Sequence, residues 1–155
     1  YGANTYSGAY SMGSIWQEVK RIYDRPLLFT EMGCDAYAEG KGADEYAQAD
    51  YFRLNWKDIE LNAAGNPGEG NAIGGVLFEW MDEWWKTLKG DAWGDPFIHN
   101  TQGDFRGPFP DSWAHEEWFG IFGQGNGSQS PFLREPRRVY EVIQKCWRGK
   151  EAGQR

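Results

Sequence analysis

The sequence predicts an α/β protein built from three successive βα units. Short apolar runs bounded by Gly and Pro alternate with longer segments of helical period, in the order strand, helix, strand, helix, strand, long loop, helix. This order predicts parallel strands joined by right-handed crossovers. At 155 residues the chain is the size of one domain, but a complete (β/α)8 barrel needs about 250. The chain is therefore either a small open α/β protein or a piece of a barrel.

The first unit begins with a short strand and a Gly/Ser loop within residues 1–10. Ser14 is a candidate helix N-cap, and Gln17 completes a capping box. A helix is predicted over residues 14–23, with one buried stripe formed by Ile15, Val19 and Ile22.

The second unit begins with the apolar run Leu27–Thr30, which predicts a strand buried on both faces and ending at Glu31. A long helix is predicted from Asp44 to about Asn62. Its apolar side chains fall within one narrow arc: Ala49, Phe52, Trp56, Ile59 and Ala63.

The third strand is predicted at residues 74–78 and runs directly into the segment 79–86. Residues 86–132 show no period of either kind, and a connection of that length is commonly functional. Pro136 is placed to start the closing helix, whose predicted apolar stripe is Val139, Val142, Ile143 and Cys146.

Charge and composition exclude several classes of protein. The net charge of −7 and the pI near 4.8 argue against a phosphate-tracking nucleic-acid binder. No apolar run reaches the roughly 18–20 residues of a membrane span, and no targeting segment is expected. Cys34 and Cys146 are too few for a disulfide scaffold and lack metal-ligand spacing, so the redox compartment stays open. We expect one domain over 1–148 with a polar tail at 149–155, no cofactor, no metal, and no nucleic-acid or membrane partner.

Aromatic residues make up 17% of the chain, nine of them Trp, and there are 21 Gly. Aromatic side chains are first of all core residues, but they also stack on the apolar faces of sugar rings. Composition alone favours the core role.

Four sequence motifs favour the sugar-stacking role. Phe-Thr-Glu-Met-Gly-Cys at 29–34 resembles strand seven of clan A glycoside hydrolases, where the nucleophilic Glu ends the strand. Asn4-Thr5-Tyr6 resembles the Asn-x-Tyr that ends strand six in families 2 and 72, and residues 74–85 resemble strand eight. Residues 134–140 are similar to the Arg-x-Pro-Lys start of the last barrel helix in family 2. The resemblance implies a partial (β/α)8 TIM barrel, strands six to eight, with the long loop before the last helix.

The same resemblance implies a retaining glycoside hydrolase or transglycosidase acting on β-linked oligo- or polysaccharides. Glu31 is then the nucleophile, Tyr6 its hydrogen-bond partner, Asn4 a substrate-binding residue and Trp80 a sugar platform. The resemblance also favours an extracellular or periplasmic location for this chain. Strand alternation separately predicts Leu27, Phe29 and Glu31 on one face, with Glu31 at the carboxyl end of the strand.

The motif for the second carboxylate is missing. Retaining hydrolysis needs an acid/base carboxyl group about 5–5.5 Å from the nucleophile. In the clan this is the Glu of an Asn-Glu pair ending strand four, and the sequence contains no Asn-Glu dipeptide. Either another chain supplies the acid, or a local one substitutes. The candidates are Glu79, Asp82 and Glu83, with Glu116 and Glu117 as more distant ones, and each has a structural alternative as a helix cap or rim residue.

Other residues in the long connection allow two interpretations. Trp84 and Trp85 form either a sugar-stacking subsite or a plug under the loop. His99 and His115 lack metal-ligand spacing, so surface or capping roles are expected. The resemblance also implies a cis peptide bond between Trp80 and Met81.

Three βα units leave two sheet edges unpaired. Inward-facing residues, among them Leu27, Phe29, Val76 and Phe78, would lack an opposing barrel wall. We therefore expect a homo-oligomer or a complementary chain bearing strands one to five. The alternative function is a non-catalytic carbohydrate-binding or assembly module derived from a glycosidase barrel. A flavodoxin-like protein ranks last, because no Gly-rich loop follows the first strand.

Overall fold

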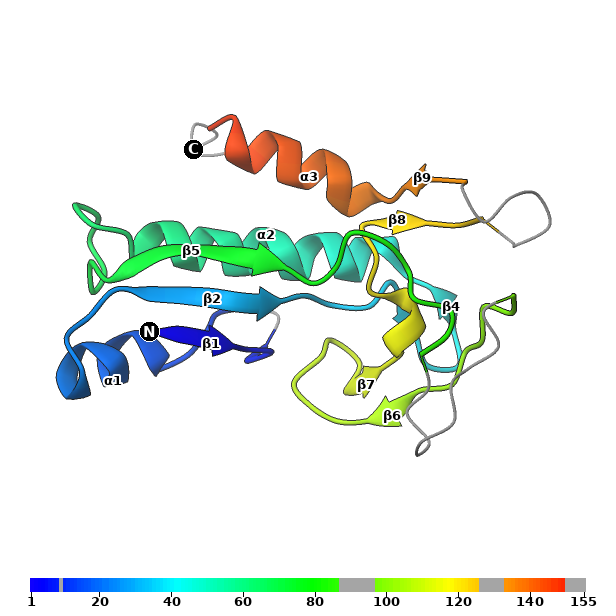
Figure 1. Cartoon of the computed structure of the whole chain (residues 1–155), viewed down its shortest axis with the longest axis horizontal. Coiled ribbons are helices and arrows are strands. Elements are labelled where there is room, and N and C mark those ends of the chain that lie inside the picture. Colours follow the sequence, from blue (N-terminus) through cyan, green and yellow to red (C-terminus); the bar gives the residue numbers. More distant parts are fainter. Residues whose placement is uncertain (9, 87–96, 126–132, 150–155) are drawn as a thin grey trace.

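The computed structural model describes residues 1–8, 10–86, 97–125 and 133–149 (Figure 1). Its centre is a parallel sheet of order β1-β2-β5, formed by Gly2–Asn4, Leu27–Met32 and Ala72–Leu77. The helices are α1 (Ile15–Ile22), α2 (Glu45–Leu61) and α3 (Arg138–Trp147). The α/β class is thus confirmed, and the described residues do not form a closed barrel. Apart from Gly149, the predicted tail lies outside the described residues.

The helices cover one face of the sheet only. Leu27, Phe29 and Met32 of β2 are fully buried and pack with apolar side chains of all three helices. Leu28 is only half-buried and Thr30 is exposed. The prediction that this strand is buried on both faces is therefore wrong, because no described segment covers the second face. The prediction that Leu27 and Phe29 face a missing barrel wall is wrong for the same reason, since both lie against the helices.

Strand β2 also contains a bulge that changes the direction of Glu31. Along β1, Ala3 pairs with Phe29 and the next residue, Asn4, pairs with Glu31, so β2 carries one extra residue. A β-bulge shifts the alternation of side chains and re-aims those that follow it. Met32, rather than Glu31, continues the buried series of Leu27 and Phe29. The predicted common face for Leu27, Phe29 and Glu31 is wrong, because strict alternation does not survive the bulge.

The long helix matches its prediction closely. Asp44 is the N-cap of α2, and its Oδ1 accepts a hydrogen bond from the Ala47 backbone N–H at 3.0 Å. The helix ends at Leu61, with Asn62 as C-cap. Buried residues lie on more than the predicted arc: Gln48, Ala49, Tyr51, Phe52, Asn55 and Ile59. This helix therefore packs against several segments at once.

The first helix departs from its prediction in two ways. Ser14 makes no side-chain cap to the backbone; its hydroxyl instead donates to Glu18 Oε1 at 2.6 Å, so the capping box with Gln17 is wrong. The buried residues are Trp16 and Val19, whereas Ile22 is 70% exposed. Trp16 packs in the core, and its indole N–H donates to Asp58 Oδ2 of α2 at 2.8 Å.

The last helix begins two residues later than predicted. Pro136 lies in β9 (Glu135–Pro136), which pairs with β8 (Phe122–Gly123), so it is not the first helical residue. The predicted stripe is otherwise confirmed, with Val139, Ile143 and Cys146 buried and Val142 packed beside them.

The segments without period form short pieces at the carboxyl ends of the parallel strands (Figure 1). Besides β8 with β9, they are two antiparallel pairs and a 3₁₀ helix: β3 (Tyr37–Ala38) with β4 (Gly42–Ala43), β6 (Asp104–Phe105) with β7 (Trp113–Ala114), and Glu116–Trp118. Among the residues that the structure describes, the non-proline cis peptide is Phe78–Glu79, so the predicted cis bond at Trp80–Met81 is wrong in position. No helix among the described residues is long and apolar enough to cross a membrane.

Candidate active site

The side chain of Glu31 is held at both oxygens where β2 ends. Asn4 Nδ2, from the end of β1, donates to Glu31 Oε2 at 2.7 Å. The Tyr6 hydroxyl donates to Glu31 Oε1 in a short hydrogen bond. The contact predicted between Tyr6 and Glu31 is therefore present. We call these three residues the carboxylate clamp.

The phenol of Tyr6 is fixed by aromatic neighbours. Its ring lies 5.8 Å from the ring of Phe109 and 6.1 Å from that of Phe119. Burial, together with the hydrogen bond and the negative charge of Glu31, raises the pKa of Tyr6 above its usual value, and the charge of Glu116 contributes in the same direction. Tyr6 therefore stays a neutral hydrogen-bond donor at physiological pH.

The candidate acid/base residues lie in two separate clusters, one around Lys86 and one around Arg137. Lys86 Nζ lies 2.5 Å from Glu83 Oε2 and 3.7 Å from Glu116 Oε2, and Glu79 belongs to the same cluster. Burial, and then the negative charge of Glu83, raise the pKa of Glu79 to about 9. Glu79 therefore carries a proton at neutral pH, which is the state that a general acid requires.

Asp82 belongs to a different arrangement. It is fully buried, and its two carboxylate oxygens are each 2.6 Å from a guanidinium nitrogen of Arg137. The Gly120 backbone N–H also donates to Asp82 Oδ1 at 3.0 Å. Burial raises the pKa of Asp82 to about 6, against the hydrogen bonds and charge of Arg137, which lower it. This bidentate pair joins the segment after β5 to the start of α3.

The tryptophans differ in exposure. Trp80 is 61% exposed and its ring lies 4.7 Å from that of Phe122, so one side of it is free for contact. Trp84 is buried and stacks on His99, which in turn stacks on Trp118 at 3.8 Å. This stack favours the plug role for Trp84. Trp85 is 39% exposed.

His115 lies in the interior, and His99 is only partly exposed. His115 is fully buried; its Nδ1 is 2.8 Å from Asp35 Oδ2 and its Nε2 is 2.8 Å from Glu39 Oε2. His99 is held between two indole rings, and its Nε2 is 3.0 Å from the backbone oxygen of Glu117. The predicted surface or capping role is wrong for His115, whose buried ring joins two loop residues and makes no side-chain cap to the 3₁₀ helix. Glu117 is buried as well and accepts hydrogen bonds from Asn100.

Sequence reasoning missed Arg137, Trp118 and Gln48. Arg137 lies inside the quoted Arg-rich run at 134–140, but only the partner Asp82 shows what the guanidinium does. The Gln48 amide donates to three backbone oxygens, those of Cys34, Phe119 and Gly120, and so connects α2 to the end of β2 and the loop. No period or motif marks such a residue.

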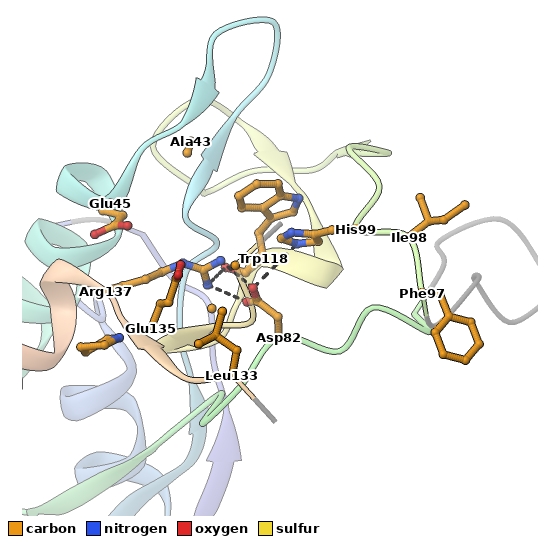
Figure 2. A pocket seen from close by; sticks show the side chains of 13 residues that line it. Ala43, Glu45, Asp82, Phe97, Ile98, His99, Trp118, Leu133, Glu135 and Arg137 are labelled. Carbon is orange, nitrogen blue, oxygen red and sulfur yellow. Dashed lines mark hydrogen bonds and ion pairs between the residues drawn. The ribbon is translucent and has the colours of Figure 1, made fainter. Parts of the chain in front are cut away.

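A cavity of about 840 Å³ lies beside the Asp82–Arg137 pair, between β9 and the segment at residues 97–99 (Figure 2). In Figure 2 the guanidinium of Arg137 and the carboxylate of Asp82 face each other next to His99 and Trp118. None of the clamp residues lines this cavity. Across the part of the chain that the structure describes, no cluster of His, Cys, Asp and Glu is placed to hold a metal ion.

Comparison with known proteins gives a structural match only. No protein-family profile and no curated protein sequence matches the chain. Among solved structures, a family 2 (GH2) β-galacturonidase from Eisenbergiella tayi, solved with glycerol, matches 96% of the chain with a TM-score of 0.55 and 14% identity. A β-glucuronidase from Bifidobacterium dentium and a β-glucosidase from Exiguobacterium marinum cover 96% and 91% of the chain, each at 17% identity and a TM-score of 0.49.

The match to the galacturonidase confirms the resemblance to family 2 at the level of fold. That neighbour is a glycoside hydrolase, as the motifs predict. The chain covers 23% of the length of the galacturonidase, 20% of the glucuronidase and 25% of the glucosidase. The chain thus spans about a quarter of the length of these proteins or less.

Proposed function

We propose that this chain forms the part of a retaining glycoside hydrolase or transglycosidase that carries the nucleophile, with β-linked glycans as substrates. The observation that supports the proposal is the carboxylate clamp. A glutamate lies at the carboxyl end of a parallel strand, at the edge where barrel enzymes place catalysis, and separate donors hold its two oxygens. This is the arrangement that an oriented carboxylate nucleophile needs.

In the proposed reaction a Glu31 oxygen attacks the anomeric carbon. The bond from that carbon to the leaving oxygen breaks while the bond to Glu31 forms, and an acid protonates the leaving oxygen. Water, or a second sugar hydroxyl in transfer, then attacks the anomeric carbon; the acid/base group takes its proton while the bond to Glu31 breaks and the Glu31 carboxylate is restored. The hydrogen bonds from Tyr6 and Asn4 orient the carboxylate for both steps. Asn4 and the exposed ring of Trp80 would contact the sugar, and Trp85 would extend that surface.

The proposed reaction also needs an acid/base carboxyl group beside Glu31. Of the local candidates, Glu79 keeps a proton at neutral pH, and Glu83 is its immediate neighbour. Asp82 is the weakest candidate, because Arg137 binds both of its oxygens. We propose that a second set of strands, from a complementary chain or a second copy, covers the open sheet face and completes a partial (β/α)8 barrel. Such a wall could also supply the second carboxylate.

Mechanism-based labelling tests the function. The protein, at a concentration where it is assembled, is incubated with activated 2-deoxy-2-fluoro β-glycosides of galacturonic acid, glucuronic acid, glucose and galactose. We expect one of them to add a single glycosyl group, found by peptide mass spectrometry on Glu31. Glu31→Gln removes both labelling and turnover of the aryl glycoside, whereas the matched variant Glu69→Gln, on a distant loop, retains them.

A wild-type chain that is never labelled, and whose glycan affinity is unchanged by Glu31→Gln, would be the non-catalytic binding module instead. Labelling at another carboxylate would assign the nucleophile elsewhere.

A further inference from the structure

Thr30, which is not one of the three clamp residues, makes a hydrogen bond to one of them. Its hydroxyl donates to Asn4 Oδ1 at 2.8 Å, and the same amide donates through Nδ2 to Glu31 Oε2 at 2.7 Å. One asparagine side chain therefore bridges two consecutive residues of β2. Consecutive side chains of a regular strand point to opposite faces, so this bridge depends on the bulge at Thr30 and Glu31.

We propose that Thr30 is a positioning residue for Glu31, acting through the amide of Asn4. This proposal rests on the proposed function. The two ends of an asparagine amide have nearly the same shape, so either could face Glu31. With Oδ1 toward the carboxylate, two acceptors would oppose each other; with Nδ2 toward it, the contact is a hydrogen bond to a charged group. Thr30 occupies Oδ1 with a donor and so selects the second orientation.

The selected orientation has a consequence for reactivity. When Asn4 holds Oε2 and Tyr6 holds Oε1, rotation of the carboxylate about its terminal bond breaks one of the two hydrogen bonds. The oxygen that attacks is then presented in one direction. Preorganisation of this kind lowers the barrier of the chemical step, so its loss lowers kcat more than it raises KM.

The test compares Thr30→Val, which keeps the shape and removes the hydroxyl, with Thr30→Ser, which keeps the hydroxyl. We expect Thr30→Val to lower kcat about tenfold on an activated aryl β-glycoside with KM changed less than about twofold, and Thr30→Ser to remain close to wild type. Thr30 is exposed, so neither variant should lose the fold, and circular dichroism checks this.

A second readout does not depend on activity. The side-chain NH₂ signals of Asn4 in ¹H–¹⁵N spectra report its hydrogen bond directly. We expect them to shift and to exchange faster with solvent in Thr30→Val, and to be restored in Thr30→Ser. If the wild-type chain hydrolyses nothing, the proposed function fails while these signals still decide the role of Thr30. Unchanged Asn4 signals and unchanged kcat in Thr30→Val, or equal losses in both variants, would overturn the proposal.

Discussion

The guanidinium of Arg137 connects three segments of the chain. It binds both oxygens of Asp82 and also donates to the backbone oxygens of Trp118 and Gly120. Arg137→Met would leave the Asp82 carboxylate buried without its counter-charge. We expect this to cost about 3–5 kcal/mol of unfolding free energy in urea at pH 8, because the buried Asp82 carboxyl must then either stay charged without a partner or take up a proton.

Arg148→Met, at the exposed C-terminal cap of α3, is the control and should change stability by less than about 0.5 kcal/mol. The double variant Asp82→Asn/Arg137→Met should recover part of the loss, because it buries no charge. Equal stabilities for wild type and Arg137→Met would mean that the pair contributes nothing to the fold.

His115 predicts a dependence of stability on pH. Burial lowers its pKa, but the hydrogen bonds to Asp35 and Glu39 outweigh burial, so the pKa of His115 is raised above its usual value near 6.5. The stabilisation is therefore fully present below about pH 6.5 and is lost as pH rises through the pKa of the folded state. Unfolding free energies measured from pH 6 upward should fall, and the fall should be smaller in His115→Gln, which leaves the contribution of Glu79, whose pKa is also raised.

The second histidine serves as the control for this measurement. Burial lowers the pKa of His99 to about 4, so above about pH 6.5 it is neutral in both the folded and the unfolded chain. His99→Gln should therefore keep the decline at alkaline pH. A decline of undiminished size in His115→Gln would assign all of it to other groups.

At this scale the sequence predicts the residues that belong to a motif and misses those that act through partners. Glu31, Tyr6 and Asn4 follow from strand ends and short patterns, and the structure brings them together. Nothing local marks His115 as the partner of Asp35, because 80 residues separate them. Contacts of that range depend on packing, which a single sequence does not display.

Between elements, the end of β2 lies very close to the residue after β5. A Cβ added at Gly33 would lie 1.8 Å from the backbone oxygen of Phe78, a distance that no side chain can occupy. Gly33→Ala must therefore push the two strand ends apart, next to Glu31. We expect a loss of about 1–3 kcal/mol or more in unfolding free energy, together with a displaced clamp.

Gly123→Ala is the matched control. Its Cβ would meet the Arg137 side chain at 3.5 Å, an ordinary contact, and its backbone is not in the left-handed region. This variant should stay within about 0.5 kcal/mol of wild type. If Gly33→Ala is equally harmless, the close approach at the end of β2 is not a constraint on the fold.

Elements with strong local signals are the ones that the sequence predicts well. Helix α2 has a capping aspartate and a long apolar period, and both of its ends agree with the prediction. The bulge in β2 has no such signal, since alternation of Leu27, Phe29 and Glu31 looks regular in the sequence. The short strands between residues 97 and 125 also escape prediction, because side-chain contacts rather than period define them.

Across the whole molecule, the two faces of the parallel sheet are unequal. Phe29 is fully buried against the helices, whereas Val76, whose neighbours Gly75 and Leu77 lie toward the helices, is 52% exposed. In Figure 1, β1 and β5 are the outer strands of the parallel sheet, and each pairs only with β2 in that sheet. A parallel sheet is ordinarily covered on both faces, so this asymmetry is what a missing wall would leave.

Val76→Lys separates folding from assembly. Its side chain is already largely in solvent, so we expect the unfolding free energy of the dilute chain to change by less than about 0.5 kcal/mol. Phe29→Ala, on the covered face, should cost about 3–5 kcal/mol of unfolding free energy and serves as the contrast.

If a second wall docks on the open face, a buried lysine at position 76 must weaken association. In sedimentation velocity over a dilution series, the wild type should shift from larger to smaller species, and Val76→Lys should make that shift at higher concentration. Aryl-glycosidase activity, where present, should fall over the same range. A wild-type chain that stays monomeric and fully active at nanomolar concentration would refute the missing wall and leave Glu79 or Glu83 as the acid.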